Sequence, residues 1–116
     1  MATIYRIQDK EGRGPFRPGF SHQWIDEDRA EWPETYMHQF GADILKNIPE
    51  QRHAGCGFFS VDQLKKWFTP VELDRLLLLG YSAVKLDSST VIARSKEQLV
   101  FHRKKPLWID AIKIDV

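Results

Sequence analysis

The segment 60–80 constrains the fold most, because it carries two successive signals for a helix start and one for a helix end. Ser60-Val61-Asp62-Gln63 is a capping box, in which the serine hydroxyl accepts from the third backbone N–H of the helix. Thr69-Pro70-Val71-Glu72 is a second helix start, with Pro in the first turn. Gly80 favours the left-handed conformation that ends a helix. We therefore predict two short helices that meet at a sharp turn. The side chains expected to face the core are Leu64, Trp67 and Phe68 in the first helix, and Leu73, Leu76, Leu77 and Leu79 in the second.

In 3–9 and after Gly80, apolar residues alternate with polar ones, which is the spacing of strands. We expect an α+β domain spanning 1–116, with an antiparallel or mixed sheet of about four to five strands. Its helices, two to three in number, should pack on one side of that sheet. The predicted strands are 3–9, 81–87, 90–94, 98–103 and 107–116, the last with a bulge near Asp110, and a further helix is predicted at 32–48.

Charge and cysteine content exclude several classes of protein. The 116 residues carry 17 basic and 16 acidic side chains, so no general positive field attracts a polyanion, and nucleic acid is not an expected partner. Cys56 is the single cysteine, which rules out an internal disulfide and fits a reducing compartment. There is no apolar run of membrane-spanning length. We expect a soluble, cytoplasmic protein that does not contact a membrane.

A long loop, 12–32, is the main candidate for a binding surface. It begins with three Gly and two Pro within eight residues, a composition that excludes regular structure. Long ordered loops in compact domains are often functional. Its start is either a turn that reverses the first strand or an anion-binding corner made by its arginines. The candidate binding residues of this loop are Arg13, Phe16, Arg17, Trp24 and Trp32.

Three other groups of residues suggest chemistry, and each also has a simpler structural interpretation. His53 and Cys56 have the spacing of two metal ligands or of a base and a nucleophile, but a structural zinc site needs four ligands, so we expect no metal. The basic run 102–105, with Arg94, is either a nucleic-acid contact or a solvated strand end. The acidic stretch 26–34 is either a solvated loop or a surface that mimics a polyanion.

The whole chain resembles small proteins encoded in bacteriophage and prophage genomes. That resemblance implies an accessory role during infection, such as interference with a host system. It is carried by Ile4-Tyr5-Arg6, Gly12-Arg13-Gly14-Pro15-Phe16, Leu64 to Phe68, Gly80-Tyr81 and Gln98-Leu99-Val100-Phe101.

A more distant resemblance is to the ADP-ribosyltransferase fold. The resemblance implies that Arg6 would contact NAD, that Ser60 would follow an aromatic strand, and that Glu97 or Gln98 would occupy the position of the catalytic carboxylate. The departures are the missing Ser-Thr-Ser triplet, the missing Glu-x-Glu pair and the amide at Gln98, which cannot stabilise an oxocarbenium-like transition state.

The sequence leaves two functions open. The first is a non-enzymatic protein that uses its long loop to bind a host macromolecule, most simply a host protein, without a cofactor. The second is an ADP-ribosyltransferase-like protein that binds or consumes NAD.

Overall fold

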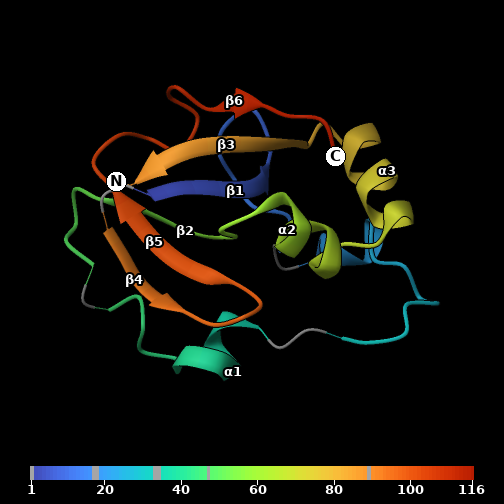
Figure 1. Ribbon diagram of the computed structural model, residues 1–116, viewed down its shortest axis with the longest axis horizontal. Helices are drawn as coiled ribbons and strands as arrows, with labels where there is room; N and C mark the ends of the chain where they lie inside the picture. The colour runs from blue at the N-terminus through green and yellow to red at the C-terminus, as the bar shows by residue number, and fades with distance from the viewer. Residues whose placement is uncertain (1, 17–18, 33–34, 47, 89) are drawn as a thin grey trace.

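Two antiparallel sheets form the framework of the chain, and helices cover one of them (Figure 1). The computed structural model describes residues 2–16, 19–32, 35–46, 48–88 and 90–116. The first sheet has the order β1 (Ala2–Gln8), β3 (Ser82–Ser88), β6 (Ile112–Lys113), and the second has the order β2 (His53–Gly57), β5 (Leu99–Arg103), β4 (Thr90–Arg94). The helices are the short 3-10 helix η1 (Ser21–Gln23), α1 (Tyr36–Phe40), α2 (Val61–Trp67) and α3 (Pro70–Leu78).

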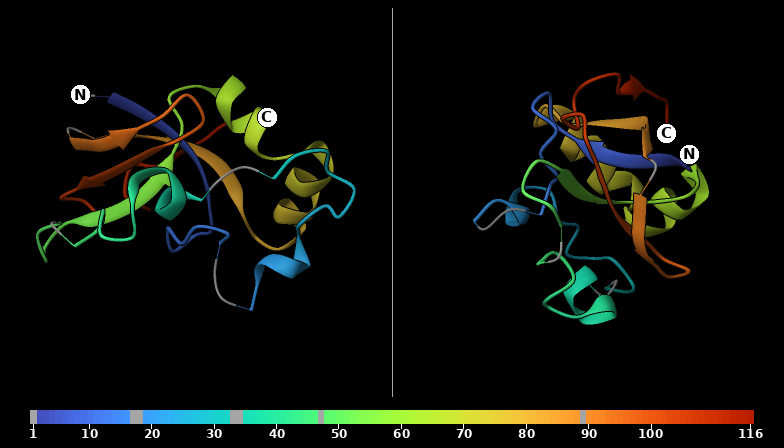
Figure 2. Two further views of the ribbon diagram at one scale, coloured as in Figure 1. Left: turned by 90° about the horizontal axis from the view of Figure 1, so that it is seen from below. Right: turned by 90° about the vertical axis from the view of Figure 1, so that its left-hand side faces the viewer.

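A pair of backbone hydrogen bonds joins the two sheets. Tyr5 in β1 and Phe58, just after β2, donate to each other's carbonyls at 2.9 and 2.7 Å. Figures 1 and 2 show β1 and β3 running together while β5 and β4 diverge from them, so the two sheets enclose a wedge. A buried apolar cluster fills that wedge: Ile4, Val84, Leu86, Leu99, Phe101 and Leu107.

A second apolar cluster lies between β1, β3 and the helices. Leu64 and Trp67 from α2 and Leu76 from α3 meet Ile7 and Ala83 there. The predicted caps are present: the Ser60 hydroxyl accepts from Gln63 N, and Thr69 with Glu72 makes a reciprocal capping box. The turn at Thr69 is what allows both short helices to place apolar residues in one cluster. No helix in the described part of the chain has the length and apolar character to cross a bilayer.

The predicted α+β class is confirmed, but the strand count is wrong. The described residues hold six strands in two three-stranded sheets, whereas we expected one sheet of about four to five. The difference arises at 53–57, where four consecutive small residues, 54–57, gave no strand pattern. This segment pairs with β5 in full register from His53 opposite Arg103.

The last predicted strand, 107–116, is mostly not a strand. Residues 107–110 form a turn, and Asp110 has φ of 57°, the left-handed conformation that ends extended structure. Only Ile112–Lys113 pair with β3. The bulge that we expected near Asp110 is therefore a turn that reverses the chain.

The predicted helix at 32–48 is also too long. Helix α1 has five residues, and Gly41 with φ of 93° ends it. Turns follow over 42–46. Positions 33, 34 and 47 of that segment lie outside the described residues.

Two of the four leucines expected to face inward in α3 are exposed. Leu76 is buried and Leu73 packs against the core, as predicted. Leu77 lies within α3 but on its outer side, 64% exposed. Leu79 is 37% exposed, because the helix ends at Leu78 and Gly80 turns the chain away with φ of 89°. Tyr81 N then donates to Leu76 O, and the Tyr81 side chain is buried in the cluster that contains Leu76.

The glycines around Cys56 allow β1 to lie directly against β2. A Cβ atom on Gly57 would stand 2.5 Å from Ile4 Cγ2 and 2.9 Å from the Tyr5 carbonyl, and one on Gly55 would collide with the Arg6 guanidinium. The glycines therefore serve packing, since no larger residue fits between these strands.

Gly57→Ala should destabilise the protein by about 1–3 kcal/mol, because the added methyl group overlaps Ile4 and a backbone carbonyl that cannot move away. Urea unfolding followed by far-UV circular dichroism measures the loss. Gly14→Ala is the matched control, since its Cβ would lie 3.4 Å from Arg6 Nη2, at the margin of an ordinary contact. Equal stability of Gly57→Ala and the wild type would contradict this account of β2.

Candidate functional site

A hollow of about 620 Å³, here called the Trp32 groove, lies where the long loop meets α2 and the turn between β4 and β5. Arg29, Glu31 and Trp32 come from the loop, while Gln63, Lys66 and Trp67 come from α2 and Lys96 and Glu97 from the turn. Gln63 Nε2 donates to Lys96 O at 3.0 Å, so the helix and the turn are fixed to each other. Three segments that are distant in sequence therefore build one concave surface.

Trp32 is the largest exposed side chain of the groove. Its side chain is 61% exposed, and the Arg29 guanidinium lies 5.4 Å from the centre of its ring. A cation over an indole face is an attractive arrangement that limits the ring's freedom. Trp32 thus combines an open surface with a fixed support on one face.

Arg29 is held in turn by Glu72, a carboxylate with no exposed surface. Arg29 Nη1 lies 3.1 Å from Glu72 Oε2, and Arg29 Nη2 donates to Trp67 O at 2.6 Å. Glu72 also accepts from the backbone N–H of Asp26 at 3.0 Å and of Thr69 at 2.9 Å. The same carboxylate therefore caps α3, pairs with a buried guanidinium and ties down the loop, which leaves neither buried charge without a partner.

The aromatic residues earlier in the loop anchor it in the core. Trp24 is fully buried, and its Nε1 donates to Pro15 O at 3.1 Å. The Phe16 ring lies 5.1 Å from the Trp24 ring and 6.4 Å from that of Trp67, although its outer side is exposed. Arg75 Nη1 donates to Ile25 O at 2.7 Å, a further tie between the loop and α3.

The five predicted binding residues therefore divide into separate groups. Trp32 lines the groove, and Phe16 presents one side of its ring to solvent elsewhere. Trp24 belongs to the core, so its ring offers no surface to a partner. Arg13 is exposed but bound to Asp9 at 2.8 Å and to Glu11 at 3.4 Å, which favours the structural turn over a free anion-binding corner. Arg17 lies outside the described residues.

Charges of both signs surround the groove. Lys66 and Lys96 supply ammonium groups that have no acidic partner among the described residues. Glu31 and Glu97 supply carboxylates, and Glu97 Oε1 lies 3.4 Å from Gln39 Nε2 of α1. The groove can therefore offer donors and acceptors to a ligand that itself carries both charges.

The residues carried over from the ADP-ribosyltransferase resemblance do not share a cleft. Arg6 is buried and donates to Cys56 O at 3.1 Å and Gly12 O at 3.2 Å. Burial lowers the pKa of Arg6 to about 10, so it stays charged at neutral pH. Ser60 caps α2 and Gln98 is buried, while Glu97 alone of the four reaches the Trp32 groove.

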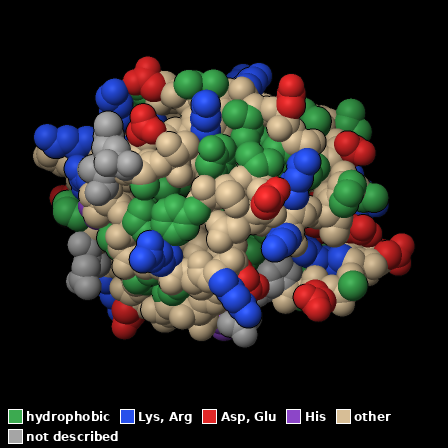
Figure 3. Space-filling view, in the orientation of Figure 1, with side chains coloured by type: hydrophobic (Ala, Val, Ile, Leu, Met, Phe, Trp, Pro, Cys, Tyr) green, Lys and Arg blue, Asp and Glu red, His purple; other side chains and the backbone are tan. Residues whose placement is uncertain are grey.

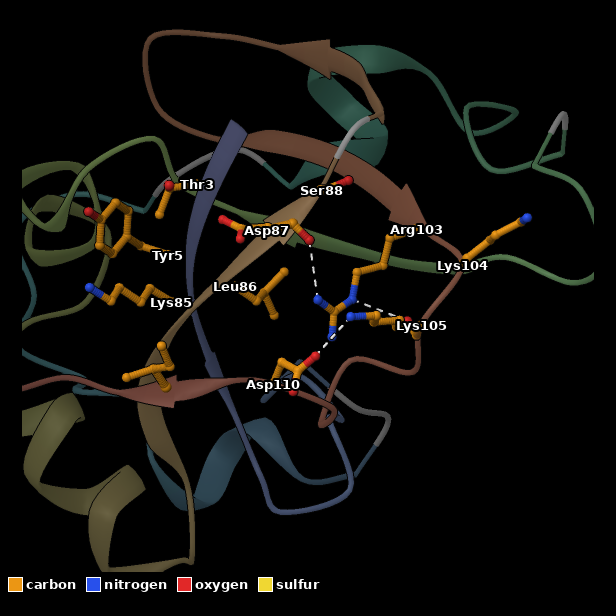
Figure 4. Close-up of a pocket in the computed structure, with 11 residues that line it drawn as sticks. Thr3, Tyr5, Lys85, Leu86, Asp87, Ser88, Arg103, Lys104, Lys105 and Asp110 are labelled. Atoms are coloured by element: carbon orange, nitrogen blue, oxygen red, sulfur yellow. Dashed lines mark hydrogen bonds and ion pairs between the residues drawn. The ribbon is translucent and has the colours of Figure 1, made fainter. Parts of the chain in front are cut away.

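The basic run 102–105 is largely used within the fold. Figure 4 shows the Arg103 guanidinium turned toward Asp87 and Lys105, with Lys104 pointing away from it. Arg103 donates to the carbonyls of Asp87, Lys105, Pro106 and Ile109, and Lys105 pairs with Asp110 at 2.9 Å. His102 accepts from Arg52 Nε, and burial with the Arg52 charge lowers its pKa. These cations fasten the turn at 106–110 and do not form a continuous basic surface.

Cys56 lies in β2 with its thiol largely enclosed. Burial raises the pKa of Cys56 to about 11, outweighing the opposite effect of the nearby Arg6 charge. Among the described residues, no group of three His, Cys, Asp or Glu side chains stands close enough to hold a metal ion. The thiol is therefore protonated at neutral pH and is a weak nucleophile.

Sequence reasoning missed Arg29 and most of the groove. Arg29 lies within the acidic stretch 26–34, for which the sequence suggested a solvated loop or a polyanion mimic, yet its side chain is 6% exposed. Arg29 is the one basic residue among five acidic ones in this stretch, and that contrast was a signal that its side chain could pair with a buried carboxylate. Gln63 and Glu72 were recognised only as capping residues, because their second roles depend on contacts with distant segments.

Glu72→Ala should lower the free energy of unfolding by about 3–5 kcal/mol, because it leaves the Arg29 guanidinium buried without a counter-charge. Urea unfolding measures the change. Asp62→Ala removes an exposed carboxylate from the first turn of α2 and should cost less than about 1 kcal/mol. A loss at Glu72 no larger than that at Asp62 would show that the buried pair contributes little.

Cys56 should react with iodoacetamide at pH 8 at least roughly tenfold more slowly in the folded protein than in urea, because burial keeps the thiol protonated and enclosed. Mass spectrometry of timed samples gives both rates. Comparable rates in the two states would mean that the thiol is accessible and ionised, contrary to this structure.

Comparison with known proteins places the chain in one family. No curated protein and no solved structure matched it. Residues 1–115 match the model of the family described as the bacteriophage T4 Y00F protein. A match over nearly the whole length agrees with the resemblance to small phage proteins seen in the sequence. The chain therefore belongs to the bacteriophage T4 Y00F protein family.

Proposed function

We propose that this phage accessory protein is a non-enzymatic binding protein that holds a short segment of a host protein in the Trp32 groove. The observation that carries the proposal is the exposed Trp32 ring, which packs on the Arg29 guanidinium, while Arg29 is itself held by the buried carboxylate of Glu72. Exposed tryptophans on rigid supports are typical of the residues that contribute most to protein interfaces. The function requires no cofactor and no covalent chemistry.

Preorganisation of the loop supports this function. Binding costs less when the interface is already ordered, because fewer side chains lose their freedom on contact. Arg29 is fixed by Glu72 and Trp67, and the loop backbone at Asp26 is fixed by the same carboxylate. A partner would therefore meet Trp32 near its final position.

The charges of the groove favour a protein over a nucleic acid. A phosphate backbone favours a surface of one sign, whereas this groove is lined by both Lys66 and Lys96 and Glu31 and Glu97. A peptide segment with an apolar side chain for Trp32 and both acidic and basic neighbours matches this pattern. The mixed signs would also select against polyanions, because the carboxylates repel phosphate.

A photo-crosslinking amino acid at position 32 should capture a host protein from a lysate of the phage host, whereas the same group at position 108 should not. Trp108 is the matched control, since it is 50% exposed and lies away from the groove. With the captured partner purified, Trp32→Ala should weaken binding by roughly tenfold or more in calorimetry, and Trp108→Ala should leave it unchanged. Equal capture at both positions would contradict the proposal.

A further inference from the structure

One face of α3 is exposed to solvent in the monomer. Val71, Asp74, Arg75 and Leu78 follow the spacing of three, four and seven residues that places side chains along one stripe of a helix. All four are exposed, with Val71 at 43% and Leu78 at 88%. The opposite face holds Glu72 and Leu76, which are buried. The stripe is therefore the solvent side of the helix.

Two apolar residues on this stripe belong to neither buried apolar cluster of the fold. Single exposed apolar residues are ordinary, but here Val71 and Leu78 stand at the two ends of the same stripe, with Leu77 at 64% exposure beside it. Figure 3 shows hydrophobic side chains with an acidic one between them at the right-hand edge, where Figure 1 places α3. The charged residues lie between the apolar ends.

The order of these residues is self-complementary. When two such helices pack antiparallel around a two-fold axis between positions 74 and 75, Val71 of one copy faces Leu78 of the other, and Asp74 faces Arg75. Each contact then occurs twice, giving two apolar pairs at the ends and two opposite-charge pairs in the centre. A parallel arrangement would instead bring Asp74 near Asp74 and Arg75 near Arg75, so the charges select the antiparallel one.

Arg75 is already partly fixed for such a contact. Its Nη1 donates to Ile25 O at 2.7 Å, which limits the motion of the guanidinium while its other nitrogens remain available. Asp74 forms no ion pair among the described residues. Charge complementarity therefore identifies the occupant of this face as a second copy of the chain rather than an unrelated apolar segment.

We propose that two copies of this protein associate through α3, antiparallel and related by a two-fold axis, with Val71 against Leu78 and Asp74 against Arg75. Helix α3 spans only Pro70–Leu78, so the interface is small, and the association belongs to the weak, concentration-dependent class. This surface is separate from the Trp32 groove, because none of the four residues lines it.

Sedimentation equilibrium over a wide range of protein concentration tests the dimer. The wild type should show reversible monomer–dimer behaviour. Leu78→Glu should raise the dimer dissociation constant at least roughly tenfold, because it places an unpaired charge against Val71 of the other copy. Val71→Lys should do the same. Trp108→Ser, which changes an exposed apolar residue elsewhere, should sediment like the wild type.

The mixture of the two single variants tests the antiparallel pairing. In a mixed dimer of Leu78→Glu and Val71→Lys chains, Glu faces Lys at one end and the original apolar pair remains at the other. The mixture should therefore form dimers at protein concentrations at which each variant alone stays monomeric. Circular dichroism shows whether each variant is folded, and both substituted positions are exposed, so the fold should be kept.

Two results would overturn the proposed association through α3. One is a wild-type protein that stays monomeric up to about millimolar concentration, because a dimer with a dissociation constant above about 1 mM is weaker than most specific protein contacts. The other is a dimer that survives both single substitutions, which would place the interface elsewhere. Dimerisation lost in each variant but not recovered in the mixture would exclude the antiparallel pairing.

Discussion

The buried carboxylate of Glu72 is the contact on which both the fold and the proposed surface depend. It caps α3 through Thr69, receives the Asp26 amide and neutralises Arg29. A buried carboxylate needs hydrogen-bond donors and an opposite charge from the protein itself, because water cannot reach it. The segments that supply those groups are therefore held in fixed positions around Glu72. The long loop has little regular structure of its own, and this carboxylate, together with the burial of Trp24, gives the loop a definite position.

The family and the geometry describe complementary aspects of the protein. Membership in the bacteriophage T4 Y00F protein family makes it a phage accessory protein, while the geometry offers a groove with an exposed tryptophan and mixed charges. The polar residues with potential for chemistry are mostly used to hold the backbone: Arg6 and Arg103 donate to carbonyls, and Cys56 is protonated. The side chains exposed for a partner include those of the groove and of the outer face of α3.

Local signals in the sequence predicted the parts of the fold that depend on local interactions. The two helix starts at Ser60 and Thr69 and the stop at Gly80 were found because capping involves residues within a few positions. Strand β2 was missed because its glycines are explained only by the distant Ile4 and Arg6 that lie against them. Trp32 was identified as a binding residue, but its support was not, since the Arg29–Glu72 pair joins residues from separate segments.

Amide hydrogen exchange at Asp26, followed by NMR, tests most directly whether Glu72 fixes the loop. The Asp26 amide in the wild type should be protected to a similar degree as the amides of α3, because its acceptor is the buried carboxylate. In Glu72→Gln this protection should fall while the central strands β1 and β3 keep theirs. Rapid exchange of the Asp26 amide in the wild type would contradict the account, since the loop would then be unattached in solution.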